Sequence, residues 1–145
     1  MSVKVETNSP QLEAWLTEAA NKQPEIVRAW QEEGSMRVME EMRGRVPIRT
    51  GFLRESITAA ETPDGFMVYP TAKYAEYVEY GTGPHTIFPS VAKVLRFELP
   101  SGAVIFAKHV EHPGFPGRFF VQKTFEVVKM ELQRLYSEIV ERLLK

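Results

Sequence analysis

Cysteine is absent from this chain of 145 residues. The protein can therefore form no disulfide, no thiolate nucleophile and no cysteine metal site. The chain also lacks a large excess of one charge. It has 18 lysines and arginines and 19 aspartates and glutamates, which gives a formal net charge of −1. A chain with this balance has no global attraction for DNA or for an acidic membrane, so any basic surface must be local.

Long hydrophobic runs are also missing. No stretch reaches the roughly 20 apolar residues that a membrane span needs, and no basic segment followed by an apolar run marks a signal peptide at the N-terminus. We therefore expect a soluble protein that is made in a cytoplasm and does not bind membranes. Its length suits one domain with a real core, and its composition, 43% hydrophobic and 26% charged, is ordinary for such a domain.

Helical spacing of apolar residues predicts two helices at the start of the chain. The first covers residues 10–23, and Pro24 then suits the first position of a second helix that runs to about Gly44, because the missing N–H is not needed there. Pro47 prevents continuation. Two pairs at i,i+4 spacing are expected to support the second helix, Glu33–Arg37 and Glu41–Arg45.

Turn residues mark two β-hairpins in the middle of the chain. Residues 56–60 and 66–69 flank the sequence Thr62-Pro63-Asp64-Gly65, in which Pro presets φ and Gly tolerates a turn. Residues 94–99 and 103–110 alternate around a second Pro/Gly turn. Between the hairpins, Thr71 is expected to cap a short helix over residues 72–80 that ends at Gly81.

A long helix is predicted to close the chain over residues 118–145. Its apolar residues form a heptad-like stripe, Val121, Phe125, Val128, Leu132, Leu135 and Ile139. At 1.5 Å per residue the helix is roughly 40 Å long, whereas a compact monomer of this size has a radius of gyration near ~15 Å. The outer part of the stripe, Leu132, Leu135 and Ile139, is therefore expected to pack against the N-terminal helices or against an adjacent subunit.

These elements predict the α+β fold class, with a small antiparallel β-sheet of hairpins packed against N-terminal helices and a long C-terminal helix. We expect a single domain over residues 1–145. Its parts are an N-terminal arm with a short helix (1–23), a helix plus β-hairpin core (24–117) and the C-terminal helix (118–145).

Two short motifs are the most informative feature of the sequence. Residues 46–57 contain the pattern P-x-x-T-G-x-L-x-x-S-I, and residues 74–82 read Y-A-x-Y-V-E-x-G-T. Pro47 of the first motif and the glycines and aromatic residues of both fix chain turns, and neither motif carries catalytic residue types. The motif positions are Pro47, Thr50, Gly51, Leu53, Ser56, Ile57, Tyr74, Ala75, Tyr77, Val78, Glu79, Gly81 and Thr82. We expect φ > 0 at Gly51 and Gly81.

With these motifs the chain resembles the minor tail proteins of long-tailed bacteriophages and prophages, in the tail-completion or head–tail joining family of lambda-like phages. A loose P-x-x-F match at Pro116–Phe120 extends the resemblance to roughly residues 36–124, although the stretch 85–113 is longer than the family's connection. The resemblance implies a structural virion protein of the tail or neck, with no enzymatic activity and no cofactor. It would assemble in the host bacterial cytoplasm as a homo-oligomeric ring that completes the tail or joins it to the head.

The implied partners are the tail tube, the head–tail connector and genome DNA that passes nearby without sequence recognition. A local basic run, Arg43, Arg45, Arg49 and Arg54, could face such a DNA channel through phosphate contacts. The simpler interpretation is that Arg43 and Arg45 end a helix, where cations suit the helix dipole. A DNA-binding accessory protein is therefore one alternative function.

A small metal-dependent hydrolase is the other alternative. His109-Val110-Glu111-His112, with His85 elsewhere, supplies ligand types that zinc accepts, but strand alternation places His109 and His112 on opposite faces. Glu76 and Glu79 could act as paired carboxylates, but solvated glutamates three apart on a helix are the simpler interpretation. We therefore expect no catalytic, cofactor or metal site.

Four tyrosines gather around the second motif, Tyr69, Tyr74, Tyr77 and Tyr80. Their rings could pack the short helix onto the sheet while the hydroxyls reach polar edges. They could equally form an interface patch, since tyrosine is enriched where proteins meet.

Overall fold

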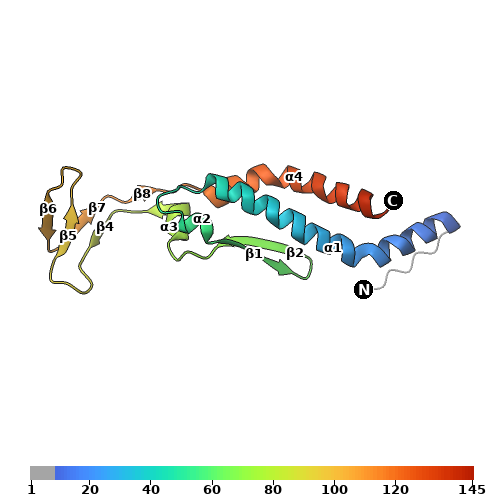
Figure 1. Cartoon of the computed structure of the whole chain (residues 1–145), viewed down its shortest axis with the longest axis horizontal. Coiled ribbons are helices and arrows are strands. Elements are labelled where there is room, and N and C mark those ends of the chain that lie inside the picture. The colour runs from blue at the N-terminus through green and yellow to red at the C-terminus, as the bar shows by residue number, and fades with distance from the viewer. Residues whose placement is uncertain (1–8) are drawn as a thin grey trace. The chain divides into compact units, whose positions relative to one another are not determined.

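The computed structural model describes residues 9–145, which divide into two compact units (Figure 1). Unit 1 holds the described residues up to Ala72 together with Phe120–Lys145, and unit 2 holds Lys73–Phe119. Both units contain helices and antiparallel strand pairs, so the predicted α+β class is confirmed. The strands pair two by two, in separate two-stranded sheets.

Unit 1 is built on α1 (Pro10–Arg45), one continuous helix of 36 residues. The predicted break before Pro24 is wrong, because Pro24 lies inside this helix. An interior proline removes a hydrogen bond and crowds the preceding turn, at a cost of roughly 3 kcal/mol, and Figure 1 shows α1 changing direction in its N-terminal third. Packing of the turns that follow offsets the cost. Ile26 is buried, and the Trp30 ring meets Tyr136 edge to face at 5.6 Å.

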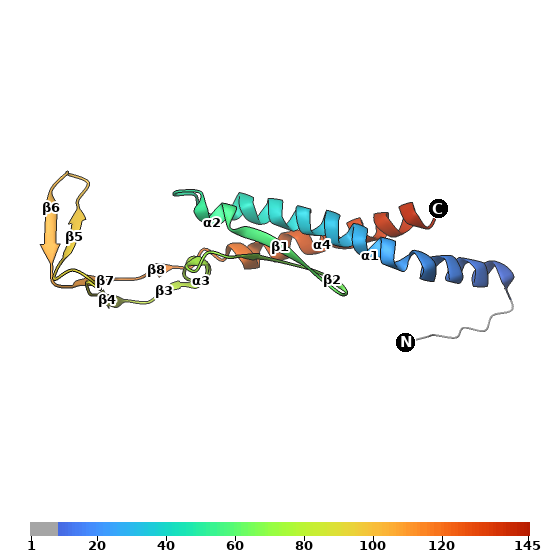
Figure 2. The same cartoon turned by 60° about the horizontal axis from the view of Figure 1, so that its bottom comes forward.

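The helix α4 (Phe120–Leu143) lies alongside α1 within unit 1 (Figures 1 and 2). The outer part of the α4 stripe was expected to pack against the N-terminal helices or against another subunit, and in the structure it packs against α1. Ile139 of this stripe has no exposed surface. Nearer the start of α4 the heptad prediction fails at Phe125, which is 66% exposed, because Phe120 and Thr124 turn inward instead. A straight helix drifts about 20° per heptad away from a strict seven-residue repeat, so one stripe cannot stay buried along its whole length.

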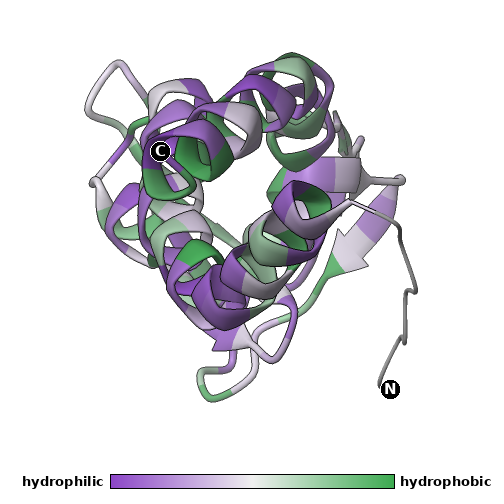
Figure 3. Cartoon of the chain, turned by 90° about the vertical axis from the view of Figure 1, so that its right-hand side faces the viewer, coloured by the Kyte–Doolittle hydropathy of each residue, from purple (hydrophilic) through white to green (hydrophobic). Residues whose placement is uncertain are grey.

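Ion pairs across the two helices replace one that the sequence suggested within α1. Arg142 binds Glu33 and Arg37 binds Glu131, so the predicted Glu33–Arg37 pair is wrong, whereas Glu41–Arg45 is confirmed. The hydrogen bond to Glu33 and its negative charge raise the pKa of Arg142 above its ordinary value. Figure 3, which looks along the helices, shows both hydrophilic (purple) and hydrophobic (green) residues on their ribbons.

The first predicted hairpin is confirmed as β1 (Ile57–Thr62) and β2 (Gly65–Pro70), which packs on α1. The side-chain amide of Gln31 donates to the backbone oxygens of Thr62 and Gly65, at 2.6 and 2.9 Å, and so fixes the turn to the helix. The Phe66 ring lies on Gly34 of α1, where an added Cβ would come within 2.5 Å of it. A glycine inside a helix costs about 1 kcal/mol relative to alanine, and here it permits this close contact.

The first motif forms the joint between α1 and β1. Gly51 has φ of 85° and begins the single turn α2 (Phe52–Glu55), in which Leu53 is buried. The Ser56 hydroxyl donates to the Leu53 carbonyl at 2.8 Å. Thr71 is not the helix cap that we predicted: its hydroxyl and its N–H both donate to the Ser56 carbonyl, at 3.1 and 2.9 Å. The short helix begins later, after Tyr74.

Unit 2 contains this short helix and six short strands. α3 (Ala75–Tyr80) is followed by β3 (Gly81–Thr82), which pairs with β8 (Phe115–Pro116). Then β4 (His85–Ile87) pairs with β7 (Val110–His112). The second predicted hairpin is confirmed as β5 (Leu95–Glu98) and β6 (Val104–Ala107). Among the described residues of both units, no helix is long and apolar enough to cross a bilayer.

Candidate interaction surfaces

At the second motif, two segments of the chain cross with their backbones in close contact. Gly81 has φ of 79°, and a Cβ there would lie 2.3 Å from the Phe115 carbonyl oxygen. A Cβ at Gly114 or Gly117 would meet the backbone of the motif segment at 2.1 or 2.4 Å. The predicted positive φ is therefore confirmed at Gly81, as it is at Gly51, and glycine serves here for close backbone contact as well as for conformation.

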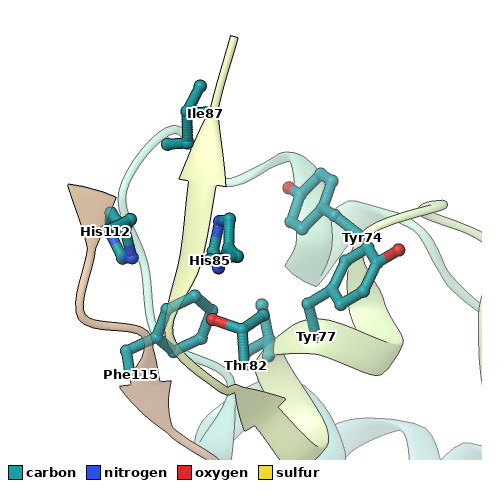
Figure 4. Close-up of a pocket in the computed structure, with 8 residues that line it drawn as sticks. Tyr74, Tyr77, Thr82, His85, Ile87, His112 and Phe115 are labelled. Atoms are coloured by element: carbon teal, nitrogen blue, oxygen red, sulfur yellow. The ribbon is translucent and has the colours of Figure 1, made fainter. Parts of the chain in front are cut away.

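Next to this crossing, unit 2 has a mostly aromatic pocket of about 490 Å³ (Figure 4). We call it the aromatic pocket, and its lining residues are Tyr74, Tyr77, Val78, Thr82, His85, Ile87, His112 and Phe115. The two tyrosines lie on one side, and the two histidines and Phe115 on the other. The Thr82 hydroxyl is buried at the pocket and has no hydrogen-bond partner among the described residues.

The structure brings His85 and His112 together but not His109. Their rings stack at a centroid distance of 5.0 Å because the two residues are cross-strand partners. The Nδ1 atom of His112 accepts from the Gly114 N–H, and that of His85 bonds the Gly83 carbonyl, both at 2.9 Å. His109 instead lies near Phe88, at 6.0 Å between ring centroids. Within residues 9–145, no group of three His, Cys, Asp or Glu side chains has the arrangement of a metal site.

Glu79, the second residue of the suggested carboxylate pair, is buried, whereas we expected a solvated side chain. Glu79 is only 6% exposed, so the interpretation as a solvated glutamate is wrong for this residue, whereas Glu76 is exposed. Sequence spacing gave no sign of this burial, because residues three apart on a helix can lie on either side of its solvent boundary.

The arginine run divides into two engaged and two free side chains. Arg43 donates to the Ile57 carbonyl at 3.0 Å, which ties the end of α1 to β1, and Arg45 pairs with Glu41. Within the described part of the chain, the side chains of Arg49 and Arg54 have no hydrogen-bond or ion-pair partner. Arg54 and Arg43 border a cavity of about 450 Å³ beside the first motif, together with Ile48, Gly51 and Glu55.

The four tyrosines are largely on the surface. Tyr69 and Tyr74 are 41% exposed, Tyr77 is 57% exposed and Tyr80 is 67% exposed. These values favour the interface interpretation over packing against a sheet, since each ring keeps a large apolar area in contact with water.

The feature that sequence reasoning missed is the apolar surface of residues 85–112, which we call the arm. No residue from Tyr80 to Phe119 is buried, and Phe88, Val91 and Phe106 are 67%, 99% and 63% exposed. One signal was available: Val104, Ile105 and Phe106 are consecutive in a strand, and alternation then places apolar side chains on both faces of the hairpin.

Close backbone turns and exposed apolar surfaces are the main features of the described residues, and they suit a protein that contacts other proteins. Residues 10–81, which hold α1, the first motif, the first hairpin and nearly all of the second motif, match the HK97-gp10-like family, described as "Bacteriophage HK97-gp10, putative tail-component". Over residues 10–81 the chain belongs to that family of phage tail components. Comparisons with curated proteins and with solved structures gave no match.

Proposed function

We propose that this protein is a non-enzymatic, cofactor-free virion protein that completes the phage tail or joins it to the head. In this role it acts as a homo-oligomeric ring at the neck, in contact with the tail tube and the head–tail connector. The observation that carries the proposal is the family match over both motif regions, where glycines at Gly51 and Gly81 fix the turns of a stiff joint. A joint of that kind orients surfaces toward partners and needs no reacting groups.

The distribution of apolar surface supports assembly as the role of these surfaces. A soluble monomer seldom exposes a contiguous apolar patch larger than a few hundred Å², yet the arm lacks a buried residue altogether. The exposed tyrosines of the second motif add rings of the kind that protein interfaces favour.

Proximity to DNA is the part of the proposal that rests on the arginine run. Arg49 and Arg54 remain available for phosphate contacts, whereas Arg43 and Arg45 are engaged within the chain. Such contacts would be independent of base sequence, because phosphate contacts position a protein on DNA without reading it.

Deletion of the gene from a phage or inducible prophage that carries it tests the function. We expect lysates in which filled heads and tails accumulate separately in electron micrographs, with infectivity restored when the protein is supplied from a plasmid. Joined, infectious particles in the absence of the protein would overturn the proposal. Native mass spectrometry of the purified chain across a concentration series tests for the ring.

A further inference from the structure

The hairpin β5–β6 of the arm has one face that consists only of apolar side chains. Leu95 pairs with Ala107 and Phe97 pairs with Ile105 across the two strands. Cross-strand partners share a face and side chains alternate along each strand, so these four residues lie together. Phe97 and Ile105 are 36% and 38% exposed, so nothing in the described residues covers them fully.

Such a hairpin needs a further contact to be stable. A two-stranded hairpin alone is marginally stable at best in water, and it becomes stable when its hydrophobic face packs on another element. The strands β5 and β6 pair only with each other, and unit 2 has no buried residue beyond Ala72 other than Ala75 and Glu79 of α3. The apolar face of β5–β6 is therefore suited to pack against another protein surface.

Unit 1 has an apolar groove of about 380 Å³ that could receive this face. Met42 of α1 and Val128 of α4 are nearly fully buried at its base, and Phe66 of β2 and Phe125 of α4 also line it. The one hydroxyl among the α4 residues that line it, on Thr124, already donates to the Phe120 carbonyl at 2.7 Å. Phe125 is the member of the α4 stripe that packing within the chain leaves uncovered.

We infer that the apolar face of β5–β6 in one copy of this protein docks into the groove of unit 1 in a second copy. A second copy fits because every chain carries both the face and the groove, and both are apolar. Charge also permits the contact: of the 18 cations and 19 anions of the chain, the arm holds Lys93, Arg96 and Lys108 against Glu98 and Glu111. The arm is thus slightly positive and the remainder slightly negative.

This contact is head-to-tail, since the face and the groove are different surfaces. Each copy donates one arm and accepts one, and a head-to-tail contact closes into a ring when its rotation permits. The inference rests on the ring of the proposed function and names the surfaces that build it.

Two adjacent residues of β6 provide a matched test. Ile105 lies on the apolar face, opposite Phe97, and Val104 lies on the other face, opposite Glu98, so the two positions match in exposure at 38% and 41% but differ in the face that receives the charge. We expect Ile105→Asp to weaken self-association by about tenfold or more, the effect of removing an interface anchor, and Val104→Asp to change it little. On the groove side, Phe125→Asp should weaken association, and Met130→Asp, on the same helix outside the groove, should not.

Engineered disulfides identify the contact directly, since the chain has no cysteine of its own. We expect Ile105→Cys and Phe125→Cys chains to form a mixed disulfide dimer when oxidised together at high concentration. Copies of Ile105→Cys alone should not cross-link. A double variant that forms its disulfide within one chain would overturn the inference, as would arm-to-arm cross-links between Ile105→Cys copies.

The outcomes separate this inference from the proposed function. A ring that persists in Ile105→Asp and Phe125→Asp means that other surfaces build it, so the inference is wrong while the ring stands. A wild-type chain that stays monomeric at its highest soluble concentration also overturns the inference. The tail role is decided independently by the deletion phenotype.

Discussion

Unit 1 and unit 2 are stabilised by different interactions. Unit 1 has an interior, with Ile57, Phe120 and Ile139 at 1%, 1% and 0% exposure. Unit 2 has almost none, and it relies on backbone hydrogen bonds such as those from Arg118 to Val78 and from Phe119 to Glu79, at 2.9 and 3.0 Å. Burial of apolar area drives folding of a lone chain. Unit 1 can therefore fold on its own interactions, whereas the arm of unit 2 needs a partner surface.

Amide hydrogen exchange measures this contrast directly. We expect amides of β5 and β6 to exchange with opening free energies near zero, and those of the buried turns of α1 and α4 to approach the global free energy of unfolding. The same measurement tests the expected single domain over residues 1–145. Equal protection of both units in the monomer would show one cooperative domain, and the proposed difference in stability between unit 1 and unit 2 would be wrong.

The largest mutational effect is expected in the interior of unit 1. Ile139→Asp places a charge where no surface is exposed, and it should lower the free energy of unfolding by about 4 kcal/mol or more. Met130→Asp, on an exposed turn of the same helix, is the control and should change it by less than about 0.5 kcal/mol. Urea denaturation followed by circular dichroism compares the two. Equal midpoints would mean that α4 does not pack on α1 in solution.

The backbone crossing in unit 2 should be the next most sensitive site. Gly81→Val combines a β-branched residue at positive φ with a Cβ 2.3 Å from a carbonyl oxygen, so we expect a loss of about 2 kcal/mol or more. Gly83→Val is matched, because a Cβ added at Gly83 would meet nothing within 4 Å and the φ of Gly83 is not positive. Exchange protection of the α3 amides reports the effect, which should be confined to unit 2.

Two glycines of α1 should respond in opposite directions. Gly34→Ala gains about 1 kcal/mol of helix propensity but forces the Phe66 ring away from a contact at 2.5 Å, and we expect a net loss of about 1 kcal/mol. Gly44→Ala meets nothing within 4 Å and should stabilise the protein by about 1 kcal/mol. Thermal unfolding of the two variants distinguishes them. Stabilisation by both would show that the ring has room to move.

The smallest effect on stability is expected at the free arginines. Reversal of Arg49 and Arg54 to glutamate should change stability by less than about 0.5 kcal/mol, because neither side chain has a partner within the described chain. If they face DNA, particles should assemble but retain or release the genome poorly. Reversal of Lys129 and Arg134 on α4 gives the same change in net charge as a control. Equal genome retention in both variants would remove the DNA assignment.

Local chemistry made much of unit 1 predictable. Turn residues located the hairpin β1–β2, and the joint glycine Gly51 has the positive φ expected of it. The break predicted at Pro24 was wrong because tertiary packing outweighed the local preference of proline. A short window of sequence contains no information about that packing. The error at Phe125 came from extending a seven-residue repeat beyond the length over which a straight helix follows it.

The surfaces were harder to predict than the elements. Alternation located β5 and β6 but did not reveal that their apolar face would stay uncovered, since that depends on which elements approach it. The stacking of His85 on His112 likewise depends on the register of β4 and β7, which their short sequences do not specify.

Gly83 and Gly114 touch, and this contact has an evolutionary consequence. A Cβ at Gly114 would lie 2.7 to 2.8 Å from the carbonyl group of Gly83, so the intervening chain leaves and returns at one point. A loop whose ends already meet can change length at little entropic cost. Lineages that carry this protein can thus lengthen, trim or exchange the inserted segment as their assembly partners change.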